Sequence, residues 1–518
     1  MRTTIQEVTS SQTPESLVQQ LKGRGTAGLA LLRSGLFDLP QTRYSFVAAR
    51  PFLVFRSYGS RCETVVAKET RGIARHGLSY GNPWRSLEQL MARYELLEEI
   101  DFPFPLGGCF GYWGYDLKNF IEPKLPRRAV NDLELPDCHV GFYDSLLVFD
   151  HRLGKQWIVS TGLAEDGDRT EGRAAEQLDF WRRALASKRI GESEGGRVHS
   201  VECAAPETTA PTTESSPGTA RPTLPFSNFS RADFVARVER VRAYIQAGDV
   251  YQVNLAQRFG APLAGSGWDF YESLAEISPA PFSAWLDCGR FQLASSSPEQ
   301  FLRLSGSHIQ TRPIKGTRPR STDPTRDAQL TYELQTSAKE MAELVMITDL
   351  LRNDLGKVCE FGSVQVPELV RLERYPQVQH LVSTVDGRLR SGVTHFGALA
   401  SCFPGGSITG APKFRAMEII DELEPVARGP YTGALGYLGF NRESQLSVII
   451  RTAICSEGRA WFHAGAGIVA DSNPEAEYEE TLAKARGFFD ALRRGWLRQS
   501  AGVYRDGQSG SPLDDCIS

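Results

Sequence analysis

The sequence predicts a mixed α/β fold with strands and helices in one large soluble protein. Short apolar runs bounded by turn residues, such as Gly28–Leu32 and Ser145–Phe149, are typical of strands. Other segments place apolar residues three and four positions apart, which is the period of a helix. With 518 residues, of which 41% are hydrophobic and 23% charged, the chain can form a substantial core. This length is typical of about three domains, although one intertwined fold also fits.

The overall charge and the termini exclude several classes of partner. The formal net charge is −4 and the pI about 6.2, so no global field attracts nucleic acid or an anionic membrane. No run approaches the roughly 20 apolar residues of a transmembrane helix. Residues 1–7 lack the apolar segment of a secretory signal, so we expect a cytoplasmic protein. The 9 cysteines and 8 histidines are dispersed, which predicts buried free thiols and no zinc site.

One segment of unusual composition divides the chain. Residues 204–225 are rich in proline and threonine and contain almost no large aliphatic side chain. Such a segment cannot bury enough apolar surface to offset the entropy of ordering it, so we predict a flexible linker over 191–226. The linker separates an N-terminal region at 10–190 from a C-terminal region at 227–497. The polar residues 498–518 form a tail that we expect to fray.

Individual elements follow from local patterns. Residues 107–116 alternate glycines with aromatic side chains, which predicts close backbone approach within a sheet. The C-terminal region opens with a helix, for which Ser230 is the predicted N-cap and Gly248 the end. Its apolar face consists of Phe234, Val238, Val241 and Ile245. Residues 251–255 then alternate as a strand that contains Gln252.

Two predicted helices each contain a pair of glutamates three residues apart. Glu340 and Glu343 project from one side of a helix within residues 337–356. Glu477 and Glu480 repeat the arrangement near the C-terminus. Two such pairs suit Mg²⁺, which takes a few oxygen ligands and keeps positions for water or substrate. Either pair on its own is more often a solvated acidic face.

Two glycine-rich segments are candidates for ligand binding through the backbone. Residues 404–413 precede a helix with Pro412 near its first turn, where backbone amides and hydroxyls can hold a carboxylate or a phosphate. Residues 465–469 are predicted as a turn that brings the backbone close to a small ligand. Neither segment matches a P-loop or a GxGxxG pattern, which excludes nucleotide binding of those kinds.

A lysine in a glycine-threonine segment is the candidate nucleophile. Lys315 lies within residues 313–320, and the amine of a desolvated lysine can attack an electrophile. An isolated lysine in a loop is more often a solvated surface side chain. The motifs around it reverse that expectation.

Taken in order, these segments resemble the chorismate-utilising enzymes. The motifs are PIKGT (313–317), SAKEMAELVMITDLLRNDLG (337–356), HLVS (380–383), PGGSITGAPK (404–413), GPYTGALGY (429–437), IRTA (450–453), GAGIV (465–469) and EYEET (477–481). The resemblance is strong over residues 225–495 and fainter in the N-terminal half, which is similar to that of anthranilate synthase component I. It implies two large stacked antiparallel sheets with helices outside, and strands from both halves of the chain.

Within the family, the lysine form of the first motif resembles aminodeoxychorismate synthase component I. Anthranilate synthases typically have a small residue at this position, which distinguishes them from the lysine form. The resemblance to the lysine form implies that Lys315 is the nucleophile. Glu299 matches the family's acid/base glutamate. Gln252 stands where isochorismate and salicylate synthases have a water-activating lysine, which argues against hydroxylation. His380 is placed near the substrate ring, and its role is left open between structural and catalytic.

The resemblance also implies a bound Mg²⁺ and a set of substrate contacts. Glu343 and Glu480 would bind the cation directly. Glu340 and Glu477 would hold it through water. The implied substrate-binding residues are Ser407, Thr409, Tyr431, Arg451, Gly465, Gly467, His380 and Gln252. Arg451 is the best match to a carboxylate because its guanidinium is a planar fork.

The expected reaction converts chorismate and ammonia to 4-amino-4-deoxychorismate, for 4-aminobenzoate and folate, through a covalent intermediate on Lys315. No Gly-x-Cys-x-Gly segment marks a glutaminase, so a separate glutamine amidotransferase subunit is expected to supply the ammonia. One alternative is an anthranilate synthase component I that has a lysine at this position. Another is a catalytically silent scaffold for an amidotransferase. The presence of Glu299, Glu343 and Glu480 beside Lys315 argues against the scaffold, which has no physical need for them.

Overall fold

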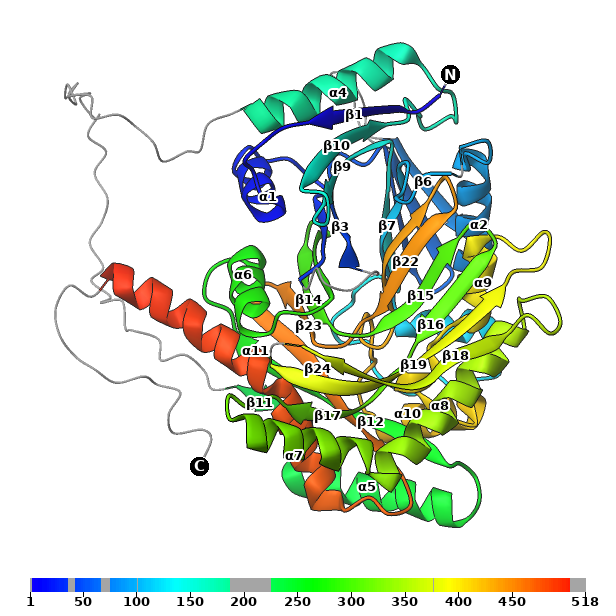
Figure 1. The fold of residues 1–518 in the computed structure, drawn as a ribbon, viewed down its shortest axis with the longest axis vertical. Coiled ribbons are helices and arrows are strands. Elements are labelled where there is room, and N and C mark those ends of the chain that lie inside the picture. The colour runs from blue at the N-terminus through cyan, green and yellow to red at the C-terminus, as the bar shows by residue number, and fades with distance from the viewer. Residues whose placement is uncertain are drawn as a thin grey trace, which may run out of the picture.

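Two large antiparallel sheets form the body of the molecule (Figure 1). The computed structural model describes residues 2–35, 42–66, 75–99, 101–186, 225–375 and 377–503. Within these ranges each sheet has 12 strands. The predicted arrangement of two antiparallel sheets with helices on the outside is confirmed.

The first sheet has the order β1-β10-β9-β3-β2-β13-β14-β23-β24-β12-β11, with β20 paired to β12. Its strands are β1 (Thr4–Val8), β2 (Ala30–Arg33), β3 (Tyr44–Ala48), β9 (Ser145–Asp150), β10 (Lys155–Ser160), β11 (Phe226–Ser227), β12 (Gln252–Pro262), β13 (Phe282–Asp287), β14 (Phe291–Ser297), β20 (Gly410–Ala411), β23 (Thr452–Ser456) and β24 (Arg459–Ile468).

The second sheet has the order β17-β19-β16-β15-β22-β21-β7-β8-β4-β5-β6, with β18 paired to β19. Its strands are β4 (Leu53–Tyr58), β5 (Arg61–Val66), β6 (Arg75–Tyr80), β7 (Gly108–Trp113), β8 (Cys138–Tyr143), β15 (Gln300–Ser305), β16 (His308–Arg312), β17 (Ile314–Pro319), β18 (Gln365–Arg374), β19 (Val378–Arg388), β21 (Ala434–Gly439) and β22 (Glu443–Val448).

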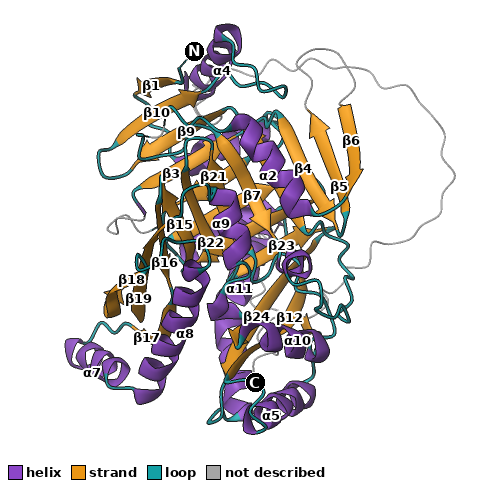
Figure 2. Cartoon of the chain, turned by 90° about the vertical axis from the view of Figure 1, so that its right-hand side faces the viewer, coloured by secondary structure: helices purple, strands orange, loops and turns teal. Residues whose placement is uncertain are grey.

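The helices cover the outer surfaces of the sheets (Figure 2). They are α1 (Pro14–Gly23), α2 (Pro83–Tyr94), α3 (Lys118–Ile121), α4 (Glu171–Ala186), α5 (Arg231–Gln246), α6 (Gly267–Ile277), α7 (Pro324–Gln335), α8 (Ala338–Gly356), α9 (His395–Cys402), α10 (Lys413–Leu423) and α11 (Pro474–Val503), with the short 3₁₀ helices η2 (Tyr115–Leu117) and η3 (Gly406–Ile408). No helix within the described ranges is long and apolar enough to cross a membrane.

Each sheet contains strands from both halves of the chain, as the family resemblance implied, and the strands of each half lie together and meet those of the other half at one strand pair. In the first sheet Leu32 of β2 lies opposite Ala284 of β13. In the second sheet Gly111 of β7 lies opposite Gly436 of β21. A Cβ atom on Gly111 would come within 2.2 Å of the His139 carbonyl oxygen, which confirms the predicted close approach of backbone in this segment.

The main core lies between the two sheets. The ring of Phe46 on β3 meets the ring of Tyr437 on β21 edge-on, with 5.2 Å between centroids. In β9, Leu146 and Val148 belong to this core, whereas Leu147 and Phe149 belong to a second core. That second core contains side chains of α1, α4, α6 and α11. β9 is therefore apolar without alternation because both of its faces are covered.

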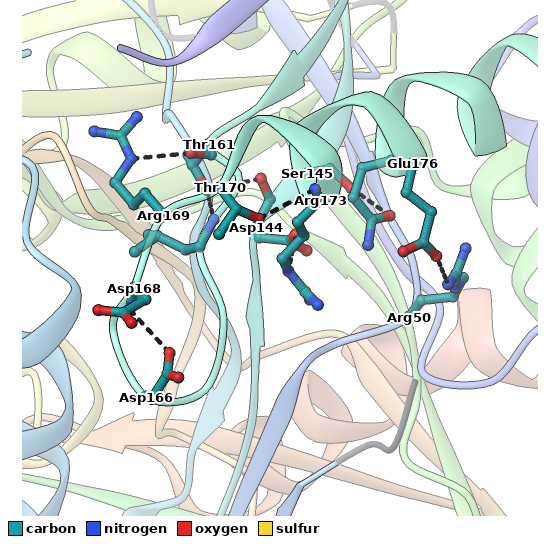
Figure 3. Close-up of polar contacts among 12 residues, drawn as sticks. Arg50, Asp144, Ser145, Thr161, Asp166, Asp168, Arg169, Thr170, Arg173 and Glu176 are labelled. Carbon is teal, nitrogen blue, oxygen red and sulfur yellow. Dashed lines mark hydrogen bonds and ion pairs between the residues drawn. The ribbon is translucent and has the colours of Figure 1, made fainter. Parts of the chain in front are cut away.

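Ion pairs fix α4 to the first sheet (Figure 3). Arg173 Nε donates to Asp144 Oδ2 at 2.8 Å, and Arg50 Nη2 donates to Glu176 Oε1 at 2.9 Å. The Arg173–Asp144 pair is buried, so removing one partner would strand a charge away from water. The Arg50–Glu176 pair is exposed and contributes little, since solvent screens it.

Several local predictions are confirmed. The helix predicted after Ser230 is α5, and the Ser230 side chain accepts a hydrogen bond from the amide of Asp233. The seven cysteines of the described residues are all free and buried. Residues 191–224 of the predicted linker and 504–518 of the predicted tail lie outside the described residues, whereas Phe226 already begins β11 and α11 continues past residue 497 to Val503.

Candidate active site

A cavity of about 480 Å³ lies where β12, β17, β19 and β24 meet α8 and α11. Its volume is in the range of ordinary small-molecule sites. The predicted site residues that line it are Glu299, Lys315, Glu340, Glu343, His380, Ser407, Tyr431, Arg451, Gly465, Gly467, Glu477 and Glu480. Only Thr409 and Gln252, among the predicted residues, are absent from its wall. The fold thus brings together side chains that are up to about 180 residues apart in the chain.

Lys315 reaches this cavity from an irregular strand. The register of β17 against β19 shifts between Lys315 and Thr317, and Gly316 at the shift has φ of 65°, a conformation that favours glycine. A Cβ atom on Gly316 would lie 3.2 Å from the Glu340 carboxylate. The Lys315 Nζ atom lies 3.8 Å from Glu343 Oε2, and the side chain is largely buried. Its amine therefore faces a cavity instead of bulk water.

Glu299 lies between β14 and β15 with its carboxyl group enclosed. It is buried, and Ser407 Oγ donates a hydrogen bond of 2.6 Å to its Oε1 atom. Burial raises the pKa of Glu299 from 4.5 to about 7, although the Ser407 hydrogen bond and the Lys315 and Lys484 ammoniums oppose the rise. A carboxyl group with such a pKa can hold a proton near neutral pH and donate it to a substrate.

The four predicted metal-binding glutamates lie on one wall of the cavity, in two helices. Glu340 and Glu343 come from the first turns of α8, whose N-cap is Ser337. Glu477 and Glu480 come from the first turns of α11. The pairs face each other, because Lys339 Nζ lies 4.0 Å from one carboxylate of each helix, those of Glu343 and Glu477. The i, i+3 spacing therefore places all four carboxylates at the same cavity, as predicted.

The donor set fits Mg²⁺ in its chemistry. Across the described residues, no three His, Cys, Asp or Glu side chains are grouped closely enough to hold a metal ion as they stand. Mg²⁺ in substrate sites is commonly bound through one or two carboxylates, with water and substrate oxygens completing the shell. Burial raises the pKa of Glu343 and of Glu477, so each carboxylate gains from a nearby positive charge. In the structure the ammoniums of Lys315, Lys339 and Lys484 supply that charge.

Arg451 and Tyr431 form a wall suited to a carboxylate. Within the described chain, no carboxylate forms an ion pair with Arg451, and burial lowers its pKa. Arg451 has φ of 48°, a left-handed conformation that is strained for this residue type. The Tyr431 hydroxyl lies 2.9 Å from the point where a Cβ of Gly465 would be. A partly buried guanidinium that forms no ion pair with a described residue is a fitting site for an anionic group of a ligand.

The predicted turn at 465–469 is wrong, because Gly465 and Gly467 lie within strand β24. They pair with Ala256 and Asn254 of β12. Both glycines line the cavity, where the lack of a side chain leaves the strand backbone accessible. A Cβ atom on Gly467 would lie 2.4 Å from Gln252 Nε2 and 3.8 Å from Lys315 Nζ.

His380 lines the cavity, whereas Gln252 and Thr409 do not. His380 Nδ1 lies 2.9 Å from Thr317 Oγ1, its Nε2 atom is buried without a partner, and burial lowers its pKa to about 4. The imidazole is therefore neutral at physiological pH. Gln252 is buried with an unpartnered Oε1 atom. The Thr409 hydroxyl is used by the loop itself, donating to the Gly405 carbonyl at 3.0 Å.

The structure adds residues that the sequence reasoning missed. Lys484 lines the cavity, and its Nζ atom lies 2.7 Å from Glu480 Oε1 and donates to the Gly465 carbonyl at 2.8 Å. Its spacing of four residues from Glu480 could have identified Lys484 from the sequence, because residues four apart share a helix face. His463, two residues before Gly465 on β24, also lines the cavity and stacks on the Tyr431 ring with 4.8 Å between centroids.

Comparison with known proteins identifies the family of this site. A family model described as chorismate binding enzyme matches residues 40–490 of the chain. The chain belongs to this family. It is 39% identical over 466 residues to aminodeoxychorismate synthase component 1 of Escherichia coli (strain K12), covering 90% of this chain and 93% of that protein. It is 38% identical over 451 residues to anthranilate synthase component 1 of Acetivibrio thermocellus, covering 87% of each.

A solved structure agrees with this assignment. The crystal structure of anthranilate synthase component I from Streptococcus pneumoniae TIGR4 is similar to this chain with a TM-score of 0.71 and 29% sequence identity. The similarity covers 87% of this chain and 93% of that one. The predicted family is therefore confirmed in sequence and in fold. Relatives with both names are similar to the same degree, so the choice between the two reactions depends on the residues in the cavity.

Proposed function

We propose that this chorismate-binding enzyme is component I of an aminodeoxychorismate synthase, which converts chorismate and ammonia to 4-amino-4-deoxychorismate. The observation that carries the proposal is the Lys315 amine, which faces the cavity close enough to Glu299 to affect its ionisation. An amine at this position can form a covalent bond to the ring, a step that anthranilate formation does not need.

The proposed reaction begins with the departure of the ring C4 hydroxyl. Glu299 is the acid, since its carboxyl group retains a proton near neutral pH and lies in the cavity. The proton moves from the Glu299 carboxyl group to the leaving oxygen, which departs as water. Lys315 first gives one proton of its ammonium group to solvent, and its amine then attacks C2 as this bond breaks, so that a C–N bond forms and the ring double bonds shift.

Ammonia completes the proposed sequence. It attacks C4, and the bond between C2 and Lys315 breaks, which returns the lysine amine and leaves the enolpyruvyl ether intact. Arg451 and Tyr431 are proposed to hold a substrate carboxylate, with the Gly465 and Gly467 backbone beside them. Such contacts keep the ring oriented during both attacks.

Mg²⁺ is the proposed cofactor, and Glu343 and Glu480 would bind it with Glu340 and Glu477 nearby. The cation supplies positive charge that attracts the ring carboxylate of chorismate. Lys484 is proposed to orient Glu480, since the two side chains are already in contact. The names of the relatives, which designate component 1 of a synthase, support a partner that delivers ammonia. We propose that this partner is a glutamine amidotransferase.

Anthranilate synthase component I is the second candidate. It is favoured by the relatives with that name, one of them 42% identical over 422 residues. The two reactions differ in their products, because anthranilate formation releases pyruvate whereas aminodeoxychorismate retains the enolpyruvyl group. A silent scaffold is a poorer explanation, since it gives no reason for a buried Glu299 beside a cavity-facing lysine.

Product analysis tests the proposal. The purified chain is incubated with chorismate, Mg²⁺ and concentrated ammonium at alkaline pH, and the products are identified by mass spectrometry. A product with an amine in place of the hydroxyl and with the enolpyruvyl group retained is the expected result. Anthranilate together with pyruvate would overturn it in favour of the second candidate. No consumption of chorismate would favour the scaffold.

A further inference from the structure

Lys413, the first residue of α10, buries its ammonium group against three acceptors. Its Nζ atom donates to Asp354 Oδ2 at 2.6 Å, to the Pro404 carbonyl at 2.9 Å and to the Cys402 carbonyl at 3.2 Å. All three N–H groups of the ammonium therefore have a partner. Because Cys402 ends α9 and Lys413 begins α10, this one group joins both ends of the loop 403–412.

The same ammonium ties the loop to α8, the helix that contains Glu340 and Glu343. Asp354 lies near the end of α8 with only 1% of its side chain exposed. A second contact joins the loop to α8, since a Cβ atom on Gly406 would lie 2.5 Å from Leu350 Cδ2. The loop 403–412 is therefore held against the helix both by a buried ion pair and by close packing.

This loop places the hydroxyl that contacts Glu299. Ser407 Oγ donates to Glu299 Oε1 at 2.6 Å, and both residues are buried. The rest of the loop is anchored through its backbone. The Thr409 carbonyl accepts from the Asn254 amide at 2.8 Å, and the Ile408 carbonyl accepts from Arg428 Nη1 at 3.1 Å. Lys413 lines no part of the cavity itself.

We infer that Lys413 is a positioning residue, which through Asp354 and the loop 403–412 holds Ser407 in place to orient the Glu299 carboxyl group toward the substrate. The inference rests on the proposed function, in which Glu299 is the proton donor. Removing the ammonium leaves the Cys402 and Pro404 carbonyls without their partner and frees the loop ends from α8. Asp354 keeps a counter-ion, because Lys357 Nζ donates to its Oδ1 atom at 2.9 Å. The substitution Lys413→Met therefore does not strand a buried charge.

The effect on Glu299 can be read in the pH dependence of turnover. The groups that affect Glu299 are Ser407 from the loop, Lys315 from β17 and Lys484 from α11. Only Ser407 depends on the position of the loop. Its hydrogen bond favours the ionised carboxylate, so losing it raises the pKa of Glu299 further above 7. Because the acid must be protonated to act, the fall of activity at high pH moves to higher pH.

The test measures kcat and KM for chorismate across pH in the full chain, at constant free ammonia and saturating Mg²⁺. The variants are Lys413→Met, Ser407→Ala, their combination, and Lys357→Met as the matched control. Lys357 shares Asp354 but makes no contact with the loop 403–412 through its side chain. Thermal melting confirms that each variant is folded. If Lys413→Met does not fold, Lys413→Gln takes its place, because its shorter neutral side chain also removes the ion pair with Asp354.

In Lys413→Met we expect kcat to fall about tenfold, a part of what general acid catalysis supplies, with KM almost unchanged. The pH at which turnover falls on the alkaline side should rise by about one unit, as in Ser407→Ala. The double variant Lys413→Met/Ser407→Ala should show no further rise. Lys357→Met should match the wild type. The inference would be overturned if turnover in Lys413→Met fell at the same alkaline pH as in the wild type. It would also be overturned if the double variant showed the sum of the shifts of the two single variants.

Hydrogen exchange provides a readout that does not depend on turnover. Amides of residues 403–412 should exchange faster in Lys413→Met than in Lys357→Met, and equal exchange in the two variants would overturn the inference. Failure of the proposed function is distinguishable, because it would appear as undiminished turnover in Glu299→Gln. In that case the loop exchange still decides whether Lys413 holds the loop.

Discussion

Replacing Glu299 with glutamine is expected to stabilise the protein above neutral pH while it removes turnover. The carboxyl group is buried in the active-site cavity, and burial raises its pKa to about 7. Glutamine has nearly the same shape and can still accept the hydrogen bond from Ser407. The substitution therefore removes the cost of burying a charge and little else.

The magnitude follows from the two pKa values. An unfolded glutamate titrates near 4.5, so folding displaces the pKa by about 2.5 pH units. At about 1.36 kcal/mol per unit, this corresponds to a stability cost of about 3 kcal/mol when the group is ionised in both states. Below pH 4.5 the carboxyl group is protonated in both states, so the cost is absent. It grows between pH 4.5 and 7 and is fully present at pH 8.

The assay is thermal melting of the wild type and of Glu299→Gln at pH 4.5 and at pH 8. We expect a melting temperature several degrees higher in the variant at pH 8 and little difference at pH 4.5. Glu443→Gln is the matched control. Burial also raises the pKa of Glu443 to about 7, but this residue of β22 is hydrogen-bonded to Ser305 and lines no part of the active-site cavity. The Glu443→Gln variant should be more stable than the wild type at pH 8 and should retain turnover.

The reasoning would be refuted if Glu299→Gln melted at the wild-type temperature at both pH values, since burial of the ionised carboxylate would then not lower the stability of the folded protein. A variant that is stabilised but fully active would refute a different step. In that case burial raises the pKa as described, but the proton of Glu299 is not needed for the reaction.

Three further substitutions test single roles in the proposed mechanism. Lys315→Ala should reduce aminodeoxychorismate formation by at least about 10²-fold with an unchanged fold by circular dichroism, and wild-type rates would remove its role as nucleophile. Glu480→Gln should weaken Mg²⁺ binding by about tenfold or more in calorimetry, because a charged ligand becomes neutral; undiminished binding would contradict its role. Arg451→Lys should raise KM for chorismate by about 10–100-fold, since lysine cannot form a bidentate contact, and an unchanged KM would place the carboxylate elsewhere.

Local patterns predicted the elements that contain the site. The period of α8 and α11 placed the glutamates on a common side of each helix, and both pairs line the cavity. Helical spacing also places Val345 with Leu344 and Thr348 on the apolar side of α8, yet its side chain is 45% exposed. A helix pattern specifies a stripe, and neighbouring elements decide how wide a stripe they cover.

Other residues of the site could not be assigned from local pattern alone. The segment 465–469 was interpreted as a turn because of its glycines, yet it continues β24 because β12 lies beside it and supplies hydrogen bonds. Thr409 was predicted to bind substrate, but its hydroxyl is directed into its own loop. Lys484 was missed because its importance depends on the Gly465 carbonyl that packing brings to it.

By itself, the sequence determined several of the strands and helices, the order of the motifs and hence the family. It also determined which side of each helix contains the glutamates. Only the tertiary structure decided that Lys315 faces Glu343, that α8 and α11 bring their carboxylates to one cavity, and that the two halves join through β2 and β13 in one sheet and through β7 and β21 in the other. The physical reason is that periodicity specifies the direction of a side chain relative to its own element. What the side chain meets there depends on the packing of elements that are distant in the chain.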